Sequence, residues 1–379
     1  MATTKIAVVG SGISAAVCAS TLARKGVAVT LFDGARGPGG RMSQRRETAE
    51  DGTEVSFDHG APYFSVSGGN APVLALLREW ESKGLVAEWN HTFGSFDFLS
   101  REFLDIEKPG ETMNKRYVGV PGMNSICNAL CHETGVESKF GTGVGKLEWS
   151  DVQKSWSVTG LDGQNLGDFN GVVVSDKNVF SSRFTGITGR PRPLDLSWAP
   201  DLAVKLQDIP VDPCFVLMLA FSEPLSSIPV KGISFKNSKV LSWSHCDSSK
   251  PGRPTTSLGL HSERWVLHST KHYAAELIAQ TGLGKLTDAT VAKVEDDLLQ
   301  EFQRTGLNIS EPFFKKAHRW GSAFPAASIA SAEKCLWKPE RRLAICGDFC
   351  VSPNVEGAIL SGLAAASQLV EAVVETANL

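Results

Sequence analysis

The stretch that decides the fold is KIAVVGSGISAA, residues 5–16. Its apolar run at residues 6–9 is typical of a buried parallel strand. The glycines at positions 10 and 12 precede a segment with helical character, and Gly26 ends that segment. A second apolar run, VAVTLF at residues 27–32, ends at Asp33. Strand, glycine turn, helix and strand in this order predict a βαβ unit.

The first turn of this unit carries the pattern G-x-G-x-x-A of a dinucleotide-binding site. Gly10 allows the tight turn, Gly12 lets the backbone approach a pyrophosphate, and Ala15 lets the helix pack closely on the strand. The helix N-terminus attracts phosphate groups. Asp33, 23 residues after Gly10, can accept hydrogen bonds from the ribose hydroxyls, which disfavours a 2′-phosphate there. The candidate cofactor-binding residues of this unit are Gly10, Gly12, Ile13, Ser14, Ala15 and Asp33.

A second glycine loop, RGPGGRM at residues 36–42, follows the acidic residue. Two glycines beside an arginine suit backbone and guanidinium contacts to phosphate or flavin oxygens. Further along, FDHGAPYF at residues 57–64 contains Gly60, which would let the chain pass close to a flat ring. The candidates from these two segments are Gly39, Gly40, Arg41, Gly60 and Ala61.

The C-terminal part of the chain supplies a matching strand and helix. The apolar run RLAIC at residues 342–346 ends in Gly347-Asp348, and a helix is expected from residue 355 to about residue 374. Asp348 can bond a ribityl hydroxyl, and the amides at the helix start can face the flavin edge where a reduced flavin carries negative charge. The candidates here are Gly347, Asp348, Val355, Glu356, Gly357 and Ala358. An NAD dehydrogenase needs no such additional C-terminal strand and helix, so the expected cofactor is FAD.

Taken together, these segments resemble the flavin amine-oxidase superfamily and, within it, the renalase-like branch. Similar stretches extend through the chain at residues 117–126, 241–253 and 319–325, and Val144 lies in a stretch similar to the family's adenine-contacting strand. The chain departs from the family pattern at His59, Pro62 and Gly321, and at residues 175–177, where Ser-Asp-Lys replaces a strand-ending segment with proline.

The resemblance implies an FAD-dependent oxidase. A small reduced substrate, a reduced nicotinamide isomer, would give a hydride to the flavin, and molecular oxygen would take the electrons as hydrogen peroxide. Two alternatives stay open: a flavin amine, polyamine or pigment-precursor oxidase, and a non-catalytic flavin protein with a redox-sensing role. An amine pocket would need an acid for the ammonium group, and the sequence does not identify one. The FAD is expected to be non-covalent, because nothing marks any of the eight cysteines for a covalent link.

The candidate catalytic residues on the substrate face are Tyr63, Trp243, His268 and Trp320. Aromatic side chains can stack on a nicotinamide or enclose an amine. Each tryptophan can equally belong to the core, and His268 can be a structural histidine. None is an obvious general base, which favours direct hydride transfer. No cluster has the spacing of metal ligands, so no metal is expected.

The chain has 379 residues, a length that favours two domains. The expected fold is α/β, with a discontinuous Rossmann-type FAD-binding domain and an inserted α+β substrate domain over the flavin. The FAD-binding domain comprises residues 1–70, 108–180 and 320–379, and the substrate domain comprises residues 71–107 and 181–319. The Pro/Gly-rich residues 189–193 and 250–254 are expected to be exposed connections.

The net charge of −3 argues against a nucleic-acid-binding surface, and the apolar runs fall short of the about 20 residues needed to span a membrane. The first strand begins at residue 5, which leaves no room for a transit peptide, so cytoplasm is expected. A processed chain would leave an organelle open. The C-terminal residues 377–379, Ala-Asn-Leu, differ from the peroxisomal Ser-Lys-Leu at two of three positions. Oligomeric state cannot be predicted from the sequence.

Overall fold

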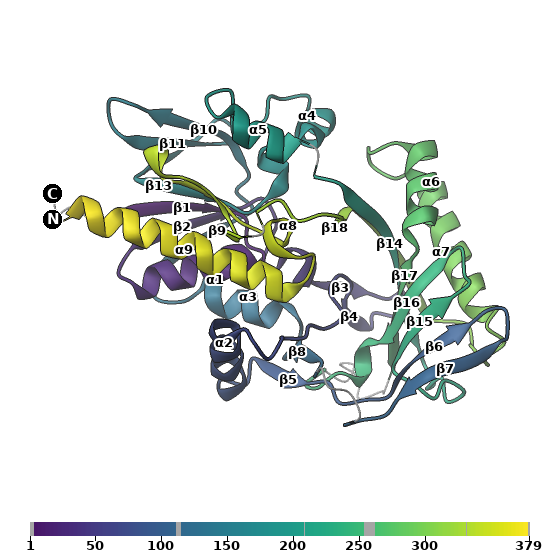
Figure 1. The fold of residues 1–379 in the computed structure, drawn as a ribbon. Coiled ribbons are helices and arrows are strands. Elements are labelled where there is room, and N and C mark those ends of the chain that lie inside the picture. The colour runs from purple at the N-terminus through teal and green to yellow at the C-terminus, as the bar shows by residue number, and fades with distance from the viewer. Residues whose placement is uncertain (1–3, 111–114, 208, 254–261, 331, 378–379) are drawn as a thin grey trace.

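The computed structural model describes residues 4–110, 115–207, 209–253, 262–330 and 332–377. These residues form two lobes, on the left and on the right of Figure 1. The left lobe contains a mostly parallel sheet between helices and a small antiparallel sheet, and the right lobe contains a large, mostly antiparallel sheet. No helix among the described residues is long and apolar enough to cross a membrane.

The parallel sheet has six strands in the order β19-β20-β13-β1-β2-β9, of which only the edge strand β19 is antiparallel to its neighbour. Its short central strands are apolar on both faces, as burial between two layers requires. The strands are β19 (Leu336–Lys338), β20 (Leu343–Ile345), β13 (Gly171–Val174), β1 (Lys5–Val9), β2 (Ala28–Asp33) and β9 (Val136–Phe140).

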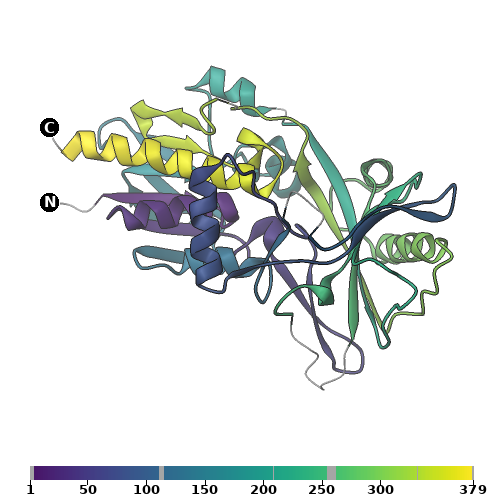
Figure 2. The same ribbon diagram turned by 60° about the horizontal axis from the view of Figure 1, so that its bottom comes forward.

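Alternate residues of β1 belong to different cores, because successive side chains of a strand point to opposite faces. Ile6 and Val8 pack with helices on one face, and Ala7 and Val9 pack with the small antiparallel sheet on the other. The first core is covered by α1 (Ile13–Arg24), α2 (Ala71–Ser82), α3 (Asn124–Cys131) and α9 (Val355–Ala377). Figures 1 and 2 both show α9, in yellow, lying beside α1, in purple.

The opposite face of the parallel sheet is covered by a three-stranded antiparallel sheet and a short helix. The three strands are β10 (Val144–Ser150), β11 (Ser155–Gly160) and β12 (Asn165–Phe169), and the helix is α5 (Pro200–Gln207). Shorter elements lie in the connections of this lobe: η2 (Lys177–Val179), α4 (Ser182–Thr188), η4 (Pro339–Arg341) and α8 (Asp348–Val351).

The right lobe is built on seven strands in the order β18-β14-β17-β16-β15-β6-β7, with only β15 and β6 parallel. They are β18 (Phe314–Pro325), β14 (Val211–Phe221), β17 (Glu263–Ser269), β16 (Leu241–Cys246), β15 (Gly232–Lys236), β6 (Phe93–Asp97) and β7 (Glu102–Glu107). One face packs against α6 (Lys271–Thr281) and α7 (Asp288–Gln303). The other face packs against β4 (Glu54–Asp58), which pairs with β3 (Gln44–Thr48).

Helices α2 and α5 contribute to the cores around the parallel sheet. Both fall within residues expected to form the substrate domain, yet Trp80 of α2 and Leu202 of α5 are buried in the cores around the parallel sheet. Each helix has an apolar face, and the residues of that face are buried. The small ribbon of β5 (Val86–Glu88) and β8 (Tyr117–Gly119) follows α2.

Candidate cofactor and substrate site

The first glycine turn lies at the carboxyl end of β1. Gly10 has φ +109°, a conformation that favours glycine, and a Cβ there would lie 3.2 Å from the backbone nitrogen of Asp176. A Cβ on Gly12 would meet no described atom within 4 Å, so this backbone faces open space at the start of α1. The turn therefore combines bare backbone with a helix N-terminus, which suits a phosphate group.

The second glycine loop lies directly against the first. The Gly39 amide donates to the Ser11 carbonyl at 2.9 Å, and Gly39 forms an isolated parallel bridge with Gly12. The loop continues into the short helix η1 (Gly40–Met42). The structure therefore brings the glycine-rich segments around residues 10–12 and 39–41 into one continuous surface.

A cavity of about 350 Å³ opens beside the first turn. Gly10 and Asp33 from the βαβ unit line it together with Val144 from β10. The Asp33 carboxylate accepts hydrogen bonds from the Ser11 hydroxyl at 2.5 Å and from the Ala35 amide at 2.7 Å, and these bonds orient it. Ligand pockets typically measure about 300–1,000 Å³, so this cavity has a suitable size and lining for an adenosine group.

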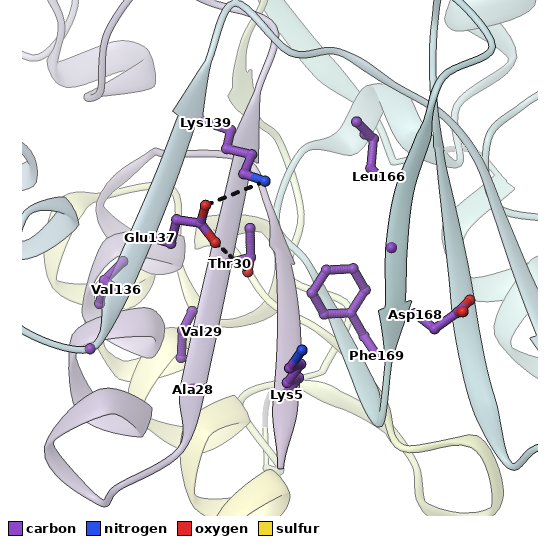
Figure 3. Close-up of a pocket in the computed structure, with 12 residues that line it drawn as sticks. Lys5, Ala28, Val29, Thr30, Val136, Glu137, Lys139, Leu166, Asp168 and Phe169 are labelled. Atoms are coloured by element: carbon purple, nitrogen blue, oxygen red, sulfur yellow. Dashed lines mark hydrogen bonds and ion pairs between the residues drawn. The ribbon is translucent and has the colours of Figure 1, made fainter. Parts of the chain in front are cut away.

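A larger hollow of about 660 Å³ lies between β2 and β9 on one side and β12 on the other (Figure 3). Two of its charged side chains are paired: Glu137 lies 3.4 Å from the Lys139 ammonium and accepts a hydrogen bond from the Thr30 hydroxyl at 3.4 Å. No residue predicted for the site lines this hollow. The smaller cavity is therefore the better candidate for binding the cofactor.

The segment after β4 runs beside the second glycine loop at a distance that only glycine permits. A Cβ on Gly60 would lie 2.0 Å from the Arg41 carbonyl oxygen, and the Ala61 amide donates to the same oxygen at 2.8 Å. The Arg41 guanidinium in turn donates two hydrogen bonds to the Asp348 carboxylate, at 2.6 and 2.7 Å. Arg41, a candidate from the second glycine loop, is therefore in contact with Asp348, a candidate from the C-terminal segment.

The start of α9 differs from the expectation in one respect. The Gly357 amide donates to the Asn354 side chain at 2.7 Å, and the Glu356 carboxylate accepts hydrogen bonds from the amide and the hydroxyl of Ser67 at 3.0 and 2.9 Å. Gly357 is therefore capped by the chain itself. The Val355 and Glu356 amides are the first-turn donors left for a cofactor, because such amides have no partner within the helix.

On the substrate side, one row of paired residues crosses four strands of the large sheet. His318 of β18 pairs with Val216, which pairs with His268, which pairs with Trp243 of β16. Directly paired residues share a face, and Val216 packs in the core that contains Phe57 of β4. The row therefore faces the left lobe, and two of the predicted substrate-face residues are neighbours in it.

The segment at residues 59–63 lies along this row. At one end the His59 ring contacts His318 and Trp320, with centroids 4.8 and 4.9 Å apart, and the Trp320 indole donates to the His59 carbonyl at 3.0 Å. At the other end the Tyr63 ring lies 6.1 Å from Trp243. All four predicted substrate-face residues thus border one region, next to the tight contact at Gly60.

Histidines of this region are uncharged at neutral pH. Burial, with a contribution from His318, lowers the pKa of His59 to about 3, and burial lowers the pKa of His318 to about 4. Burial also lowers the pKa of His268 well below its usual value and, together with the charge of Lys250, lowers that of His245 to about 4. The substrate side therefore presents neutral imidazoles.

A network of buried ion pairs, formed by Asp58, Asp247, Lys250 and Arg253, lies next to this region and was not predicted from the sequence. The Lys250 ammonium bonds the Asp247 carboxylate at 2.7 Å and the Asp58 carboxylate at 3.1 Å, and Arg253 donates to Asp58 as well. Burial alone would raise the pKa of Asp247, but the charge of Lys250 and a hydrogen bond from His245 hold it well below its usual value. Each of the two carboxylates is thus paired with a cation.

The expectation that residues 250–254 form an exposed connection holds for Gly252 but is wrong for the side chains of Lys250 and Arg253. Lys250 is 3% exposed, and the Arg253 side chain is 1% exposed; Pro254 lies outside the described residues. The sequence contains one signal for this network: Asp247 and Lys250 carry opposite charges and lie three residues apart. Residues 189–192 are exposed, as expected, and Pro193 is buried.

All eight cysteines are free and buried. Burial raises the pKa of the Cys335 thiol to about 12 and that of the Cys346 thiol to about 11, and it also raises the pKa of Cys350. A thiolate is the reactive form of cysteine. These three thiols, the ones considered for a covalent flavin link, are therefore poor nucleophiles in this structure.

Comparisons with known proteins agree with the fold. Residues 8–80 match the family described as NAD(P)-binding Rossmann-like domain. Over 99% of this chain and 100% of the other, the structure is similar to that of a protein from Exiguobacterium sp. 255-15 described as a protoporphyrinogen oxidase, with a TM-score of 0.65 and 12% identity. The expected fold class, a Rossmann-type α/β domain with a second domain, is confirmed.

Two further solved structures have the same fold at similar similarity. An oxidoreductase from Methanosarcina mazei matches over 95% of this chain and 99% of its own, with a TM-score of 0.64 and 12% identity. A wild-type putrescine oxidase bound to putrescine matches over 98% of this chain and 99% of its own, with a TM-score of 0.65 and 12% identity. These likenesses show that the chain shares its overall fold with the three proteins.

The described residues fit FAD. The two glycine loops offer bare backbone for a pyrophosphate, and Asp33 and Val144 line a cavity for adenosine. The Lys177 ammonium nearby is buried with no hydrogen-bond partner among the described residues, and an anionic group would supply one. A flavin dinucleotide meets each of these requirements.

Proposed function

We propose that the chain is an FAD-dependent oxidoreductase that takes a hydride from a small neutral reduced substrate, a reduced nicotinamide isomer, with molecular oxygen as the electron acceptor. The observation that carries the proposal is the charge of the substrate face. Its imidazoles are neutral, and the buried carboxylates of Asp58 and Asp247 are paired with Lys250 and Arg253. Such a surface favours a neutral ring over a cation.

The cofactor would be held by residues from three parts of the chain. The glycine loops would bind its pyrophosphate, Asp33 its adenosine ribose, and Asp348 with the first amides of α9 its flavin half. When bound, FAD supplies a hydride acceptor and, with oxygen, a route to hydrogen peroxide. The resemblance to renalase-like proteins and the fold of the solved oxidases support this assignment.

Two buried polar atoms in the row of paired residues can orient the substrate. Trp243 Nε1 and His268 Nε2 have no hydrogen-bond partner in the described part of the chain. An indole N–H only donates, whereas a neutral imidazole nitrogen donates or accepts according to its tautomer. Together they match the oxygen and the amide hydrogens of a carboxamide. Tyr63 and Trp320, at the two ends of the row, limit how far a flat ring can shift.

An amine or pigment-precursor oxidase is the alternative, and the named neighbours include a putrescine oxidase and a protein described as a protoporphyrinogen oxidase. An ammonium group needs a carboxylate or an aromatic face. Among the described residues of the substrate side, Asp58 and Asp247 already neutralise buried cations. An amine bound at either carboxylate would bring a further cation next to Lys250 and Arg253, which disfavours the alternative.

The test is anaerobic mixing of the flavin-loaded protein with reduced nicotinamide isomers, putrescine or benzylamine at equal concentration, followed at the visible absorption band of the flavin. We expect the nicotinamides to bleach the flavin faster than either amine. In Trp243→Phe, which loses the indole donor, the apparent dissociation constant for nicotinamide should rise about 2- to 10-fold, the range for one neutral hydrogen bond. Trp149→Phe, on β10 in the other lobe, is the control. Rapid bleaching by an amine while nicotinamides stay inert would refute the proposal.

A further inference from the structure

Lys177 lies where the parallel sheet ends beside the first glycine turn. It begins the short helix η2, three residues after Val174 of β13, and Val174 pairs with Val9 of β1. A Cβ added to Gly10 would lie 3.2 Å from the nitrogen of the preceding residue, Asp176. Lys177 therefore follows a strand end at the same edge of the sheet as the predicted pyrophosphate-binding turn.

The Lys177 ammonium is a buried cation that lacks a bonded partner. Nζ is inaccessible to solvent and forms no hydrogen bond with any described residue. Burial, and next the charge of Arg41, lower the pKa of Lys177 to about 8, while Asp348 and Asp176 act in the opposite direction. A buried charge is unfavourable unless it is paired, so this position lacks an anion.

Neighbouring acidic side chains do not supply that anion through a bond. The Asp348 carboxylate accepts both of its short hydrogen bonds from Arg41, and the Asp176 carboxylate accepts one from the Asn178 amide at 2.9 Å. A further cation, Arg183, also acts on Lys177, and it lines the adenosine-sized cavity together with Asp176. The cationic side chains of Lys177 and Arg183 thus lie near each other, between that cavity and the Arg41–Asp348 pair.

We infer that Lys177 binds a phosphate oxygen of the cofactor's pyrophosphate. The inference rests on the proposed FAD site and adds a residue to it. A dinucleotide that extends from the cavity beside Asp33 to Asp348 carries its phosphates past the two glycine loops. The backbone of these loops donates neutral hydrogen bonds, and Lys177 adds a charged one, which is stronger. In this chain, Lys177 belongs to the segment that replaces the proline-containing strand end of renalase-like proteins.

The experiment compares the wild-type apoprotein with Lys177→Met, Lys177→Arg and Lys205→Met by isothermal titration calorimetry. Lys205 is an exposed residue of α5 and serves as the control. The ligands are FAD, ADP and adenosine, so that ADP and adenosine differ only in the phosphates. Circular dichroism and thermal melting of each apoprotein report whether the substitution disturbs the fold.

In Lys177→Met we expect the dissociation constants of FAD and ADP to rise by about 10- to 100-fold, the range for a charged hydrogen bond, while that of adenosine stays unchanged. Lys177→Arg should recover part of the loss, and Lys205→Met should match the wild type. Equal losses for ADP and adenosine, or no loss for ADP, would overturn the assignment of Lys177. If the wild type binds ADP in a Lys177-dependent manner but binds no flavin, the proposed function fails and the phosphate contact stands. If it binds neither ADP nor FAD, both fail.

Discussion

Arg41 and Asp348, which are 307 residues apart in the sequence, form a bidentate ion pair with nitrogen–oxygen distances of 2.6 and 2.7 Å. Arg41 also donates to the Ala323 carbonyl at 2.7 Å. The Asp348 side chain is 4% exposed. This pair therefore joins the second glycine loop, the end of β18 and the start of α8, and it closes the candidate cofactor site on one side.

Removing the charge of Asp348 tests the importance of this junction. In Asp348→Asn we expect the free energy of unfolding to fall by about 1–3 kcal/mol, because a charged hydrogen bond is lost and the Arg41 guanidinium is left in a partly buried position. Flavin retention after dialysis should fall as well. Urea denaturation and the flavin-to-protein absorbance ratio measure the two effects. Asp201→Asn, which removes an exposed ion pair with Lys338, is the control, and equal behaviour of the two variants would contradict the prediction.

Asp33 is predicted to bind the adenosine ribose. In Asp33→Asn, the acceptor for ribose hydroxyls is weakened by loss of charge, and each charged bond is worth about 1.5–3 kcal/mol. We expect the dissociation constants of FAD and of adenosine to rise together, by at least about tenfold. Calorimetric titration of the apoprotein measures both. Unchanged adenosine binding would show that Asp33 only orients Ser11 and Ala35.

The βαβ unit and the C-terminal strand and helix could be predicted from sequence because their signals are local. The apolar run at residues 6–9, the glycines that follow and Asp33 lie within one short stretch, and the sheet geometry then places them at one edge. Gly347 and Asp348 could be predicted as cofactor-binding residues in the same way, because they lie between a strand end and a helix. Each of these motifs depends only on nearby residues.

The buried charge network could not be predicted in this way, because its pairs join distant segments. Lys250 lies 192 residues from Asp58, and a Pro/Gly-rich segment usually lies on the surface. The contact between His59 and the Trp320 ring likewise spans 261 residues. Only the packing of β4 against the large sheet brings these side chains together, and no local pattern encodes that packing.

Lys250 is expected to be essential for stability. Lys250→Met would leave the Asp58 and Asp247 carboxylates buried with less compensating charge, and breaking a buried ion pair typically costs about 3–5 kcal/mol. The matched control is Lys83→Met, which removes a lysine whose side chain is 53% exposed and should cost less than about 1 kcal/mol. Urea denaturation of the two variants is the measurement. A Lys250→Met protein as stable as the control would contradict the network described above.

The buried histidines make stability depend on pH in a defined window. In the folded chain, burial lowers the pKa of His59 to about 3 and that of His318 to about 4, from an ordinary value of 6.5. As the pH falls below 6.5, the unfolded chain takes up protons at these positions before the folded chain does, so acid favours unfolding. We expect the contribution of these groups to be complete above pH 6.5 and to be lost progressively towards pH 4 and below.

His318→Gln should make this dependence shallower, because it removes one titrating group. Arg45 and Arg319 disfavour protonation of His318 in the folded chain, and neither is changed in this variant. Urea denaturation at several pH values within the window gives the slope. His132→Gln, at the exposed end of α3, is the control. A slope for His318→Gln equal to that of the wild type would show that His318 does not contribute.

The most direct test of the central claim, that this chain binds FAD and reduces it with a neutral reduced nicotinamide, is an anaerobic titration of the purified protein followed by visible absorption. We expect an oxidised flavin spectrum that disappears at one equivalent of the active nicotinamide isomer per flavin and returns when oxygen is admitted. A protein that shows no flavin spectrum even after incubation with FAD would refute this claim, as would a bound flavin that stays oxidised with every reduced nicotinamide isomer.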